Sequence, residues 1–496
     1  MNKSIKKASV IGSGIGGLAI AVRLAVKGYD VKVFDSNTKP GGKAVEFSLS
    51  GFRFDKGPSL LTMPEKIDEL FYIAGKNPED YFSYSKINES CRYFYEDGVV
   101  IKGFTDAERF SQELFETSNI PKKNTIKYLK RNAFIFDSTS YLFLEKSLHR
   151  FKTYLSFKVL FSALKIPWLN LFSSMNKINS KIFLDTKIVR IFNRYATYNG
   201  SDPYLAPGVL NSISNLEFKK GAFFADKGMS SIAKSIYKLA VELGVKFYFS
   251  SSVNEIKVNN GNVKGVVVND SFIASDLVVC NTDIHYVYNK LLDKKFSLNY
   301  KKDQERSSSA IIYYWGISKV FNQLQVHNIL FSENYKKEFQ HIRNGNSIYS
   351  DPTIYINITS KKIKSDAPNN SENWFVMINV PHDKNQDWDK IISKSRIEII
   401  TKINRILDVN IEDHIKCEKV VDPRNIEVET HSFKGALYGT SSNTKEAAFF
   451  RHPNFSKNIK GLYFCGGSVH PGGGIPLVLS SAKIVEELIH LDYEKK

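Results

Sequence analysis

The sequence predicts an α/β fold centred on a doubly wound parallel sheet of the Rossmann type. Two observations carry this prediction. Strand and helix patterns recur in segments far apart along the 496-residue chain, and glycine-rich turns join strand to helix near both of its ends. The segments are residues 8–35, 221–285 and 461–489. We therefore expect a sheet domain that is discontinuous in sequence and carries an inserted α+β domain.

The first segment combines an apolar strand at residues 8–11, a helical pattern that runs to Gly28, and a second strand that ends at Asp35. The turn between the first strand and the helix has the pattern G-x-G-x-x-G and consists of Gly12, Ser13, Gly14, Ile15, Gly16 and Gly17. Glycines at these positions permit a sharp bend, close approach of a pyrophosphate, and tight packing of helix on strand. An acid at the end of the second strand accepts hydrogen bonds from a ribose. The segment therefore predicts dinucleotide binding.

The residues after Asp35 do not continue with the helix and strand that an NAD-binding domain normally has. Residues 40–43 instead form a second glycine turn, in which Gly42 is followed by Lys43, and a third constrained turn contains Gly57, Pro58 and Ser59. Backbone amides and a lysine in such turns can approach a phosphate or a flavin ring. An ordinary β-turn with a solvated lysine is the other interpretation of the second turn.

The two later segments repeat the α/β pattern. An amphipathic helix over residues 230–243 is followed by a strand at 245–251, an Asn-Gly hairpin over 255–268, and an apolar strand that begins at residue 277. The last segment predicts a strand at 462–465, a glycine-rich loop to Gly474, and a helix that begins at Pro476. We expect both glycine clusters to follow strands of one sheet and to contact one large ligand.

Three stretches together resemble the bacterial carotenoid desaturases, the flavoproteins of the phytoene-desaturase type. They are "VIGSGIGGLAIAVRLAVKGYDVKVFDSNTKPGGKAVEFSLSGFRFDKGPSLLTMP", "GMSSIAKSIYKLAVELGVKF" and "GALYGTSSNTKEAAFFRHPNFSKNIKGLYFCGGSVHPGGGIPLVLSSAKI". Within that family, "GPSLLTMP" and "ALYGTSSN" most resemble the hydroxycarotenoid 3,4-desaturase branch. Many members carry glutamate where this chain has Asp35, so a carboxylate is kept.

The resemblance implies an amine-oxidase-like flavoprotein architecture that binds FAD without a covalent bond. The first glycine turn would lie at the pyrophosphate and Asp35 at the ribose. Val253, on the strand after the amphipathic helix, matches the position whose backbone holds the adenine side. The cofactor-binding positions implied for the rest of FAD are Gly42, Lys43, Pro58, Ser59, Gly466, Gly467, Gly474, Ile475 and Pro476.

The implied activity is FAD-dependent desaturation of a carotenoid, with 3,4-desaturation of a 1-hydroxylated acyclic end by hydride transfer to flavin as the main expectation. A polyene delocalises the charge that hydride loss leaves, so the protein needs chiefly to position the chain in a long apolar tunnel. No catalytic residue is predicted. His285, His431 and His470 could accept a proton, and His470 is the better candidate because it precedes the last glycine loop, but lone histidines more often have structural roles.

Several alternatives share parts of this pattern. Phytoene or diapophytoene desaturation and carotenoid isomerisation use the same cofactor and substrate class. An amine-oxidase-like enzyme would act on a polar cation. A prenyl-binding escort-type protein, the non-enzyme alternative, would bind no flavin and would not need the intact glycine turn.

A basic stretch of the chain predicts that the protein binds to a membrane surface. Residues 150–194 contain nine Lys or Arg and one acid of a chain whose net charge is +18, and aromatic residues such as Trp168 and Phe172 alternate with the cations. This composition suits the lipid headgroup boundary. A forty-carbon polyene exposed to water would cost on the order of 30 kcal/mol, so it must come from a bilayer. We expect a cytoplasmic protein, peripheral on the inner face of the cell membrane; a core helix pair with solvated lysines is the other interpretation.

Other classes of partner are not indicated. No nucleic-acid motif accompanies the basic stretch. The four cysteines are scattered without a CxxC pair, which predicts neither a disulfide framework nor a metal site. We assign residues 1–85, 221–289 and 435–496 to the FAD-binding domain and residues 86–220 and 290–434 to the substrate-binding, membrane-associating domain. The sequence does not predict an oligomeric state.

Overall fold

The computed structural model describes residues 5–154, 165, 168–297, 304–345 and 347–493. Five parallel strands form the first sheet, in the order β19-β13-β1-β2-β9. Their bounds are β1 (Lys7–Ile11), β2 (Asp30–Phe34), β9 (Lys246–Tyr248), β13 (Leu277–Cys280) and β19 (Leu462–Phe464). The strands come from all three predicted segments, which confirms the prediction of one discontinuous parallel sheet. Because β1, β13 and β19 run parallel, the glycine turns after β1 and β19 lie at the same edge of the sheet, with the end of β13 between them.

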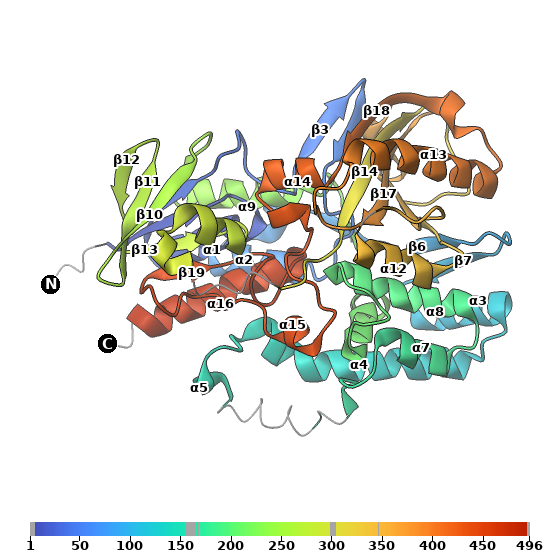
Figure 1. Cartoon of the computed structure of the whole chain (residues 1–496), viewed down its shortest axis with the longest axis horizontal. Coiled ribbons are helices and arrows are strands. Elements are labelled where there is room, and N and C mark those ends of the chain that lie inside the picture. The colour runs from blue at the N-terminus through green and yellow to red at the C-terminus, as the bar shows by residue number, and fades with distance from the viewer. Residues whose placement is uncertain (1–4, 155–164, 166–167, 298–303, 346, 494–496) are drawn as a thin grey trace.

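Both faces of this sheet are covered. Alternate strand residues point to opposite faces, so Val10 and Val33 pack in one apolar cluster while Ile11 and Phe34 pack in another. The first face is covered by α1 (Ile15–Val26), α2 (Glu65–Ile73), α9 (Ser230–Glu242) and α16 (Ile475–Tyr493). The second is covered by an antiparallel sheet of β10 (Val253–Asn259), β11 (Asn262–Val268) and β12 (Ser271–Ala274). Figure 1 shows these helices and strands gathered in one half of the molecule.

The hairpin between β10 and β11 has the predicted turn. Asn260 and Gly261 both have positive φ, at 48° and 70°, as a type I′ turn requires. The expected position of Val253 on the strand after the amphipathic helix is wrong by one strand. The strand after α9 is β9, which ends at Tyr248, and Val253 begins β10 instead. The chain bends at residues 249 and 250, between these two strands, and Ser250 has a φ of 50°.

A seven-stranded sheet forms the other half, in the order β18-β14-β17-β16-β15-β6-β7. Its pairs are antiparallel except for the parallel pair of β15 and β6. The bounds are β6 (Glu89–Phe94), β7 (Val100–Phe104), β14 (Ser309–Ile317), β15 (His327–Leu330), β16 (Ile354–Ile358), β17 (Glu372–Val380) and β18 (Ile415–Val421). This sheet has the antiparallel character expected of an inserted α+β domain.

Helices cover the seven-stranded sheet, and further helices lie below it in Figure 1. The longer ones are α3 (Ala107–Ser118), α4 (Lys122–Glu145), α7 (Met175–Ile182), α8 (Thr186–Asn193), α12 (Tyr335–Asn344), α13 (Trp388–Leu407) and α14 (Pro423–Thr430). α13 packs on the sheet through Trp388, Ile399 and Ile403. No helix within the described ranges is long and apolar enough to cross a membrane.

Two small sheets connect the halves. β5 (Tyr84–Lys86) pairs with β8 (Phe223–Ala225), and the hairpin of β3 (Glu46–Leu49) and β4 (Phe52–Asp55) packs against β14 through Phe47, Phe54 and Tyr314. The remaining short elements are α5 (Phe151–Tyr154), α10 (Ile284–Tyr286), α11 (Lys294–Ser297), α15 (Lys445–Phe449), and the 3₁₀ or π turns η1 (Pro78–Asp80), η3 (Arg194–Asn199), η4 (Gly208–Ser214), η5 (Leu216–Lys220), η6 (Val287–Leu291), η7 (Thr359–Lys361), η8 (Lys364–Asp366), η9 (Ile411–His414) and η10 (Phe433–Gly435).

Candidate flavin site and substrate cavity

One continuous cavity of about 640 Å³ joins the two halves of the molecule. It begins at the glycine turns of the parallel sheet and reaches residues of α4, η3 and the seven-stranded sheet. Of the predicted cofactor-binding residues, all but Ser13 and Gly17 line it. Segments that are hundreds of residues apart in sequence therefore meet at one cavity.

The first glycine turn is shaped by close backbone contacts. Gly12 has a φ of +94°, and its N–H donates to the Phe34 carbonyl over 2.8 Å. A Cβ on Gly17 would lie 2.0 Å from the Gly12 carbonyl oxygen, so this position tolerates no side chain. α1 then begins at Ile15, and its N-cap residue, Gly14, has no side chain that could accept hydrogen bonds from the first turn. The N–H groups of its first turn thus remain available for an anion at the positive end of the helix dipole.

Asp35 fixes the same turn from the side. Its Oδ2 accepts hydrogen bonds from the Ser13 backbone N–H and the Ser13 hydroxyl, both over 2.6 Å. Its Oδ1 accepts from the backbone N–H of Asn37 over 2.8 Å. The carboxylate is buried, lines the cavity, and lies at the end where Val253 and His431 also line it. Ser13 therefore contributes by holding Asp35, although it does not line the cavity itself.

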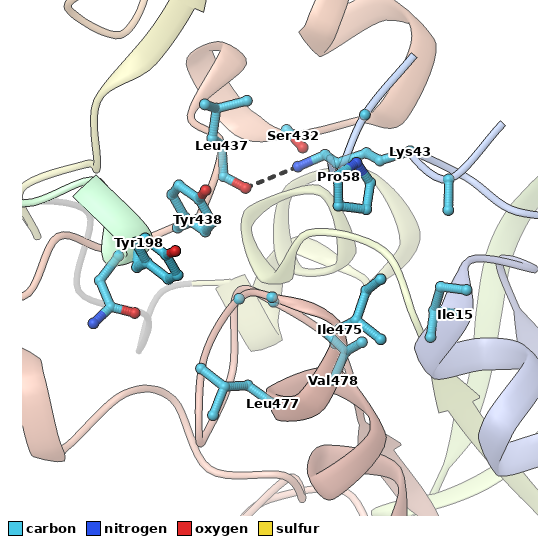
Figure 2. A pocket seen from close by; sticks show the side chains of 18 of the residues that line it. Ile15, Lys43, Pro58, Tyr198, Ser432, Leu437, Tyr438, Ile475, Leu477 and Val478 are labelled. Atoms are coloured by element: carbon cyan, nitrogen blue, oxygen red, sulfur yellow. Dashed lines mark hydrogen bonds between the residues drawn. The ribbon is translucent and has the colours of Figure 1, made fainter. Parts of the chain in front are cut away.

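The second glycine turn packs directly on the first. Gly14 and Gly41 form a parallel bridge, and a Cβ on Gly42 would lie 3.1 Å from the Gly14 Cα. The next residue, Lys43, donates from Nζ to the Leu437 carbonyl over 3.0 Å, as Figure 2 shows. Burial lowers the pKa of Lys43 to about 8, although Asp283 favours the charged form. The lysine is therefore not the solvated surface residue that the pattern alone allowed.

The last glycine loop completes this end of the cavity. Gly466, Gly467 and Gly474 line it, and α16 begins beside them at Ile475. Gly474 has a φ of +106°, and a Cβ there would meet no atom within 4 Å, so the loop faces open space at this point. In Figure 2, Ile475 and Val478 form one wall, while Lys43, Tyr438 and Tyr198 lie across from them.

Sequence reasoning missed Asn281 and Thr282, which follow β13 between the two glycine clusters. A Cβ on Gly16 or on Gly466 would lie 2.6 Å from Asn281 Nδ2, and Nδ2 donates to the Cys465 carbonyl over 3.2 Å. The amide thus fills the space that these glycines leave. The sequence does contain a signal for these two residues. β13 has four apolar residues and is followed directly by polar ones, at the edge of the sheet where both glycine clusters lie.

These features fit FAD. The starts of α1 and α16 and three glycine-rich turns meet at the cavity, the buried carboxylate of Asp35 lines it, and Lys43 packs against Gly57 of the third turn. Thr282 lines the same cavity, and its Oγ1 is buried and has no hydrogen-bond partner among the described residues. Such an atom is expected where a polar ligand completes the site.

The three histidines considered as proton acceptors differ in whether they line the cavity. His285 and His470 are buried and do not line the cavity, and burial lowers the pKa of each to about 3. His470 Nε2 contacts the Lys146 carbonyl at 3.0 Å. His431 does line the cavity, but its ring stacks on Tyr286, with ring centroids 4.3 Å apart, at the Asp35 end. This placement supports structural roles for His285 and His470.

Comparisons with known proteins agree with this geometry. The 1-hydroxycarotenoid 3,4-desaturase of Flavobacterium sp. (strain P99-3) is 49% identical over 98% of this chain and 99% of its own length. The 4,4′-diapolycopene oxygenase of Methylomonas sp. is 32% identical over 98% of each chain.

Solved structures show the same fold at low sequence identity. An oxidoreductase from Methanosarcina mazei aligns with a TM-score of 0.61 and 15% identity, over 97% of this chain and all of its own. The Rab GDI of Plasmodium falciparum aligns with a TM-score of 0.54 and 13% identity, over 97% of this chain and 98% of its own. The family model described as "Flavin containing amine oxidoreductase" matches residues 15–485. The chain belongs to this family of flavin-containing amine oxidoreductases, and it is an FAD-dependent oxidoreductase.

Proposed function

We propose that this protein desaturates a carotenoid, and that its reaction is 3,4-desaturation of a 1-hydroxylated acyclic end. The observation that carries this proposal is the end-to-end similarity, at 49% identity, to a 1-hydroxycarotenoid 3,4-desaturase. The cavity supports it, because it extends from the glycine turns into a region lined by Phe136, Phe143, Phe375 and Met377. An elongated apolar molecule fits such a space better than a polar cation does.

We propose that the predicted site residues hold FAD, with α1 at the pyrophosphate and Asp35 at the ribose. When bound, FAD supplies the two-electron acceptor for the removal of hydrogen from the chain. The protein's own contribution is position: the apolar wall keeps water out and holds the polyene in one orientation. Tyr198, Tyr438 and Leu477 line the part of the cavity that Figure 2 shows, and we assign them to this task.

A second candidate is oxygenation at the end of a carotenoid chain. The 32% identity to 4,4′-diapolycopene oxygenase favours it, because this relative too is matched over its whole length. The lower identity ranks it behind desaturation. Phytoene or diapophytoene desaturation and carotenoid isomerisation would need the same cofactor and the same kind of cavity, so the product of the reaction distinguishes them from 3,4-desaturation.

Expression in hosts that accumulate defined carotenoids tests the proposal. In a host that makes a 1-hydroxylated acyclic carotenoid, we expect the product absorption to move to longer wavelength by one conjugated double bond. A host that makes only colourless phytoene is expected to stay colourless. Gly14→Val serves as the inactive control, because even a Cβ there would lie 2.9 Å from Asn281 Oδ1. A new oxygen in the product mass would support the second candidate instead.

We also propose that the protein binds the inner face of the cell membrane near residues 150–174. Phe151, Trp168 and Phe172 expose 77%, 60% and 81% of their surface, and Lys445 lies over the Phe172 ring at 4.0 Å. Residues 155–164 and 166–167 of the basic stretch lie outside the described residues. Beyond residue 174, α7 and α8 bury Met175, Ile188 and Ile191, and Arg194 is buried too, so we restrict the proposed surface to the first part of the stretch.

The division into an FAD-binding domain and a substrate-binding domain is likewise our proposal. In its support, residues 1–85, 221–289 and 435–496 contain all strands of the parallel sheet, and residues 86–220 and 290–434 contain all strands of the seven-stranded sheet. The cavity lies where these two groups of residues meet.

A further inference from the structure

The wall of the cavity that the seven-stranded sheet contributes contains a residue with a polar atom that no described residue satisfies. Two residues that line the cavity each have a buried side-chain atom without a hydrogen-bond partner in the part of the chain that the structure describes: Thr282 Oγ1 and His327 Nε2. Thr282 follows β13 beside the glycine turns, where the proposed cofactor accounts for it. His327 begins β15 of the seven-stranded sheet and is 3% exposed. Because a buried unpaired nitrogen is costly, it indicates a missing ligand group.

The other ring nitrogen of His327 is held in place. Nδ1 lies 2.7 Å from Tyr355 Oη, and Tyr355 Oη donates to Ser59 Oγ over 2.7 Å. Asn357 Nδ2 lies 3.2 Å from the same Nδ1. Ser59 belongs to the third turn of the N-terminal segment, which we assign to the cofactor. The imidazole is therefore oriented by contacts that connect it, through two hydrogen bonds, to the proposed flavin site.

The neighbouring charged groups satisfy one another. Arg194 donates to both oxygens of Glu217, at 3.0 and 2.9 Å, and Glu217 also accepts from Tyr195 and Tyr198. This buried ion pair needs no further partner. Burial lowers the pKa of His327 to about 4, so its ring is neutral at neutral pH. His327 thus offers one uncharged hydrogen-bonding atom in a cavity whose nearby lining includes Ile329 and Phe331.

A hydroxyl group is the ligand that suits this atom best. The Nε2 of a neutral histidine is a donor in one tautomer and an acceptor in the other, and a hydroxyl can pair with either one. A hydrocarbon end can pair with neither and would leave the nitrogen unsatisfied. We propose that His327 Nε2 binds the terminal hydroxyl of the substrate, and so selects a hydroxylated chain end and fixes how deep it enters the cavity. This inference rests on the proposed function.

A pair of variants separates this role from a structural one. His327→Asn places an amide near the Nδ1 position, keeps contact with Tyr355, and removes the group at Nε2. His327→Gln extends a polar atom toward the Nε2 position. We would measure kcat/KM of the FAD-loaded enzyme in detergent micelles for a 1-hydroxylated acyclic carotenoid and for the same carotenoid without the hydroxyl. Retention of each carotenoid on the protein, followed by absorption, gives a binding ratio that does not depend on turnover.

The wild type is expected to prefer the hydroxylated substrate. His327→Asn is expected to lower this preference by about tenfold to a hundredfold, mainly through KM, and His327→Gln to retain most of it. His341→Asn, at an exposed histidine on α12, is the control and should leave the ratio unchanged. If His327→Asn slows both substrates equally, or leaves both ratios as in the wild type, the role of His327 is refuted. If the wild type turns over neither carotenoid, the proposed function fails, and the binding ratio still decides on His327.

Discussion

Lys43 donates a hydrogen bond from Nζ to the backbone carbonyl of Leu437, a residue 394 positions later in the chain. The contact closes one side of the cavity and joins the second glycine turn to the C-terminal part of the protein (Figure 2). Burial lowers the pKa of this lysine to about 8. The fold therefore holds a cation where desolvation disfavours it, which an anionic or electron-rich ligand would offset.

Lys43→Met is expected to weaken FAD binding about tenfold at pH 7, because the variant loses the cation that faces the ligand. Wild-type affinity is expected to fall as the pH rises through about 8, since the lysine loses its proton there. The affinity of the variant should show no such fall. Fluorescence titration of the apoprotein with FAD between pH 6.5 and 9.5 measures both. Lys39→Met, at an exposed lysine of the same segment, is the control. A wild-type affinity that does not change over this pH range would contradict the assignment.

Gly17, in the first turn of α1, and Gly28, just after the end of α1, offer a matched pair of substitutions. Alanine at Gly17 would put a Cβ 2.0 Å from the Gly12 carbonyl, whereas at Gly28 it would meet no atom within 4 Å and strain only a φ of +82°. We expect Gly17→Ala to cost about 3 kcal/mol of unfolding free energy and to abolish FAD binding. Gly28→Ala should cost about 1 kcal/mol and bind FAD normally. Urea denaturation and FAD titration measure these effects, and equal losses in the two variants would refute the proposed role of the turn.

The parts of the site that were predicted from sequence depend on local geometry. Gly12, Gly14 and Gly17 are recognisable because a turn that approaches a phosphate restricts its own residues, whatever the rest of the fold does. Asn281 was missed because its position depends on β13 lying between β1 and β19, which is a property of strand order. His327 was missed for a similar reason, since its contacts with Tyr355 and Ser59 join three distant segments, and the segments of His327 and Tyr355 carry no local motif.

The basic stretch of residues 150–194 also shows what sequence composition cannot predict. Its composition alone could not separate exposed aromatic residues from buried ones. Phe172 is exposed, whereas Phe183 and Phe192 stack on each other in the core, with ring centroids 5.0 Å apart. Arg194 contributes to the positive charge of the stretch but forms a buried ion pair with Glu217. Tertiary packing therefore divides a segment that appears uniform in sequence.

The proposed membrane surface is tested by removing its aromatic groups. The double variant Trp168→Ser and Phe172→Ser is expected to lower binding to vesicles of phosphatidylglycerol and phosphatidylcholine at least about tenfold, because each side chain loses its burial in the headgroup boundary. Co-sedimentation measures the bound fraction.

The control variant for that test is Ile397→Ser and Val428→Ser. It removes two exposed apolar side chains on α13 and α14, which lie across the molecule from α5 in Figure 1, and it should bind like the wild type. The remaining attraction of the aromatic variant is expected to depend on ionic strength, because only the cations of the stretch would still act on the anionic lipid. Equal binding by both double variants would place the docking surface elsewhere on the molecule.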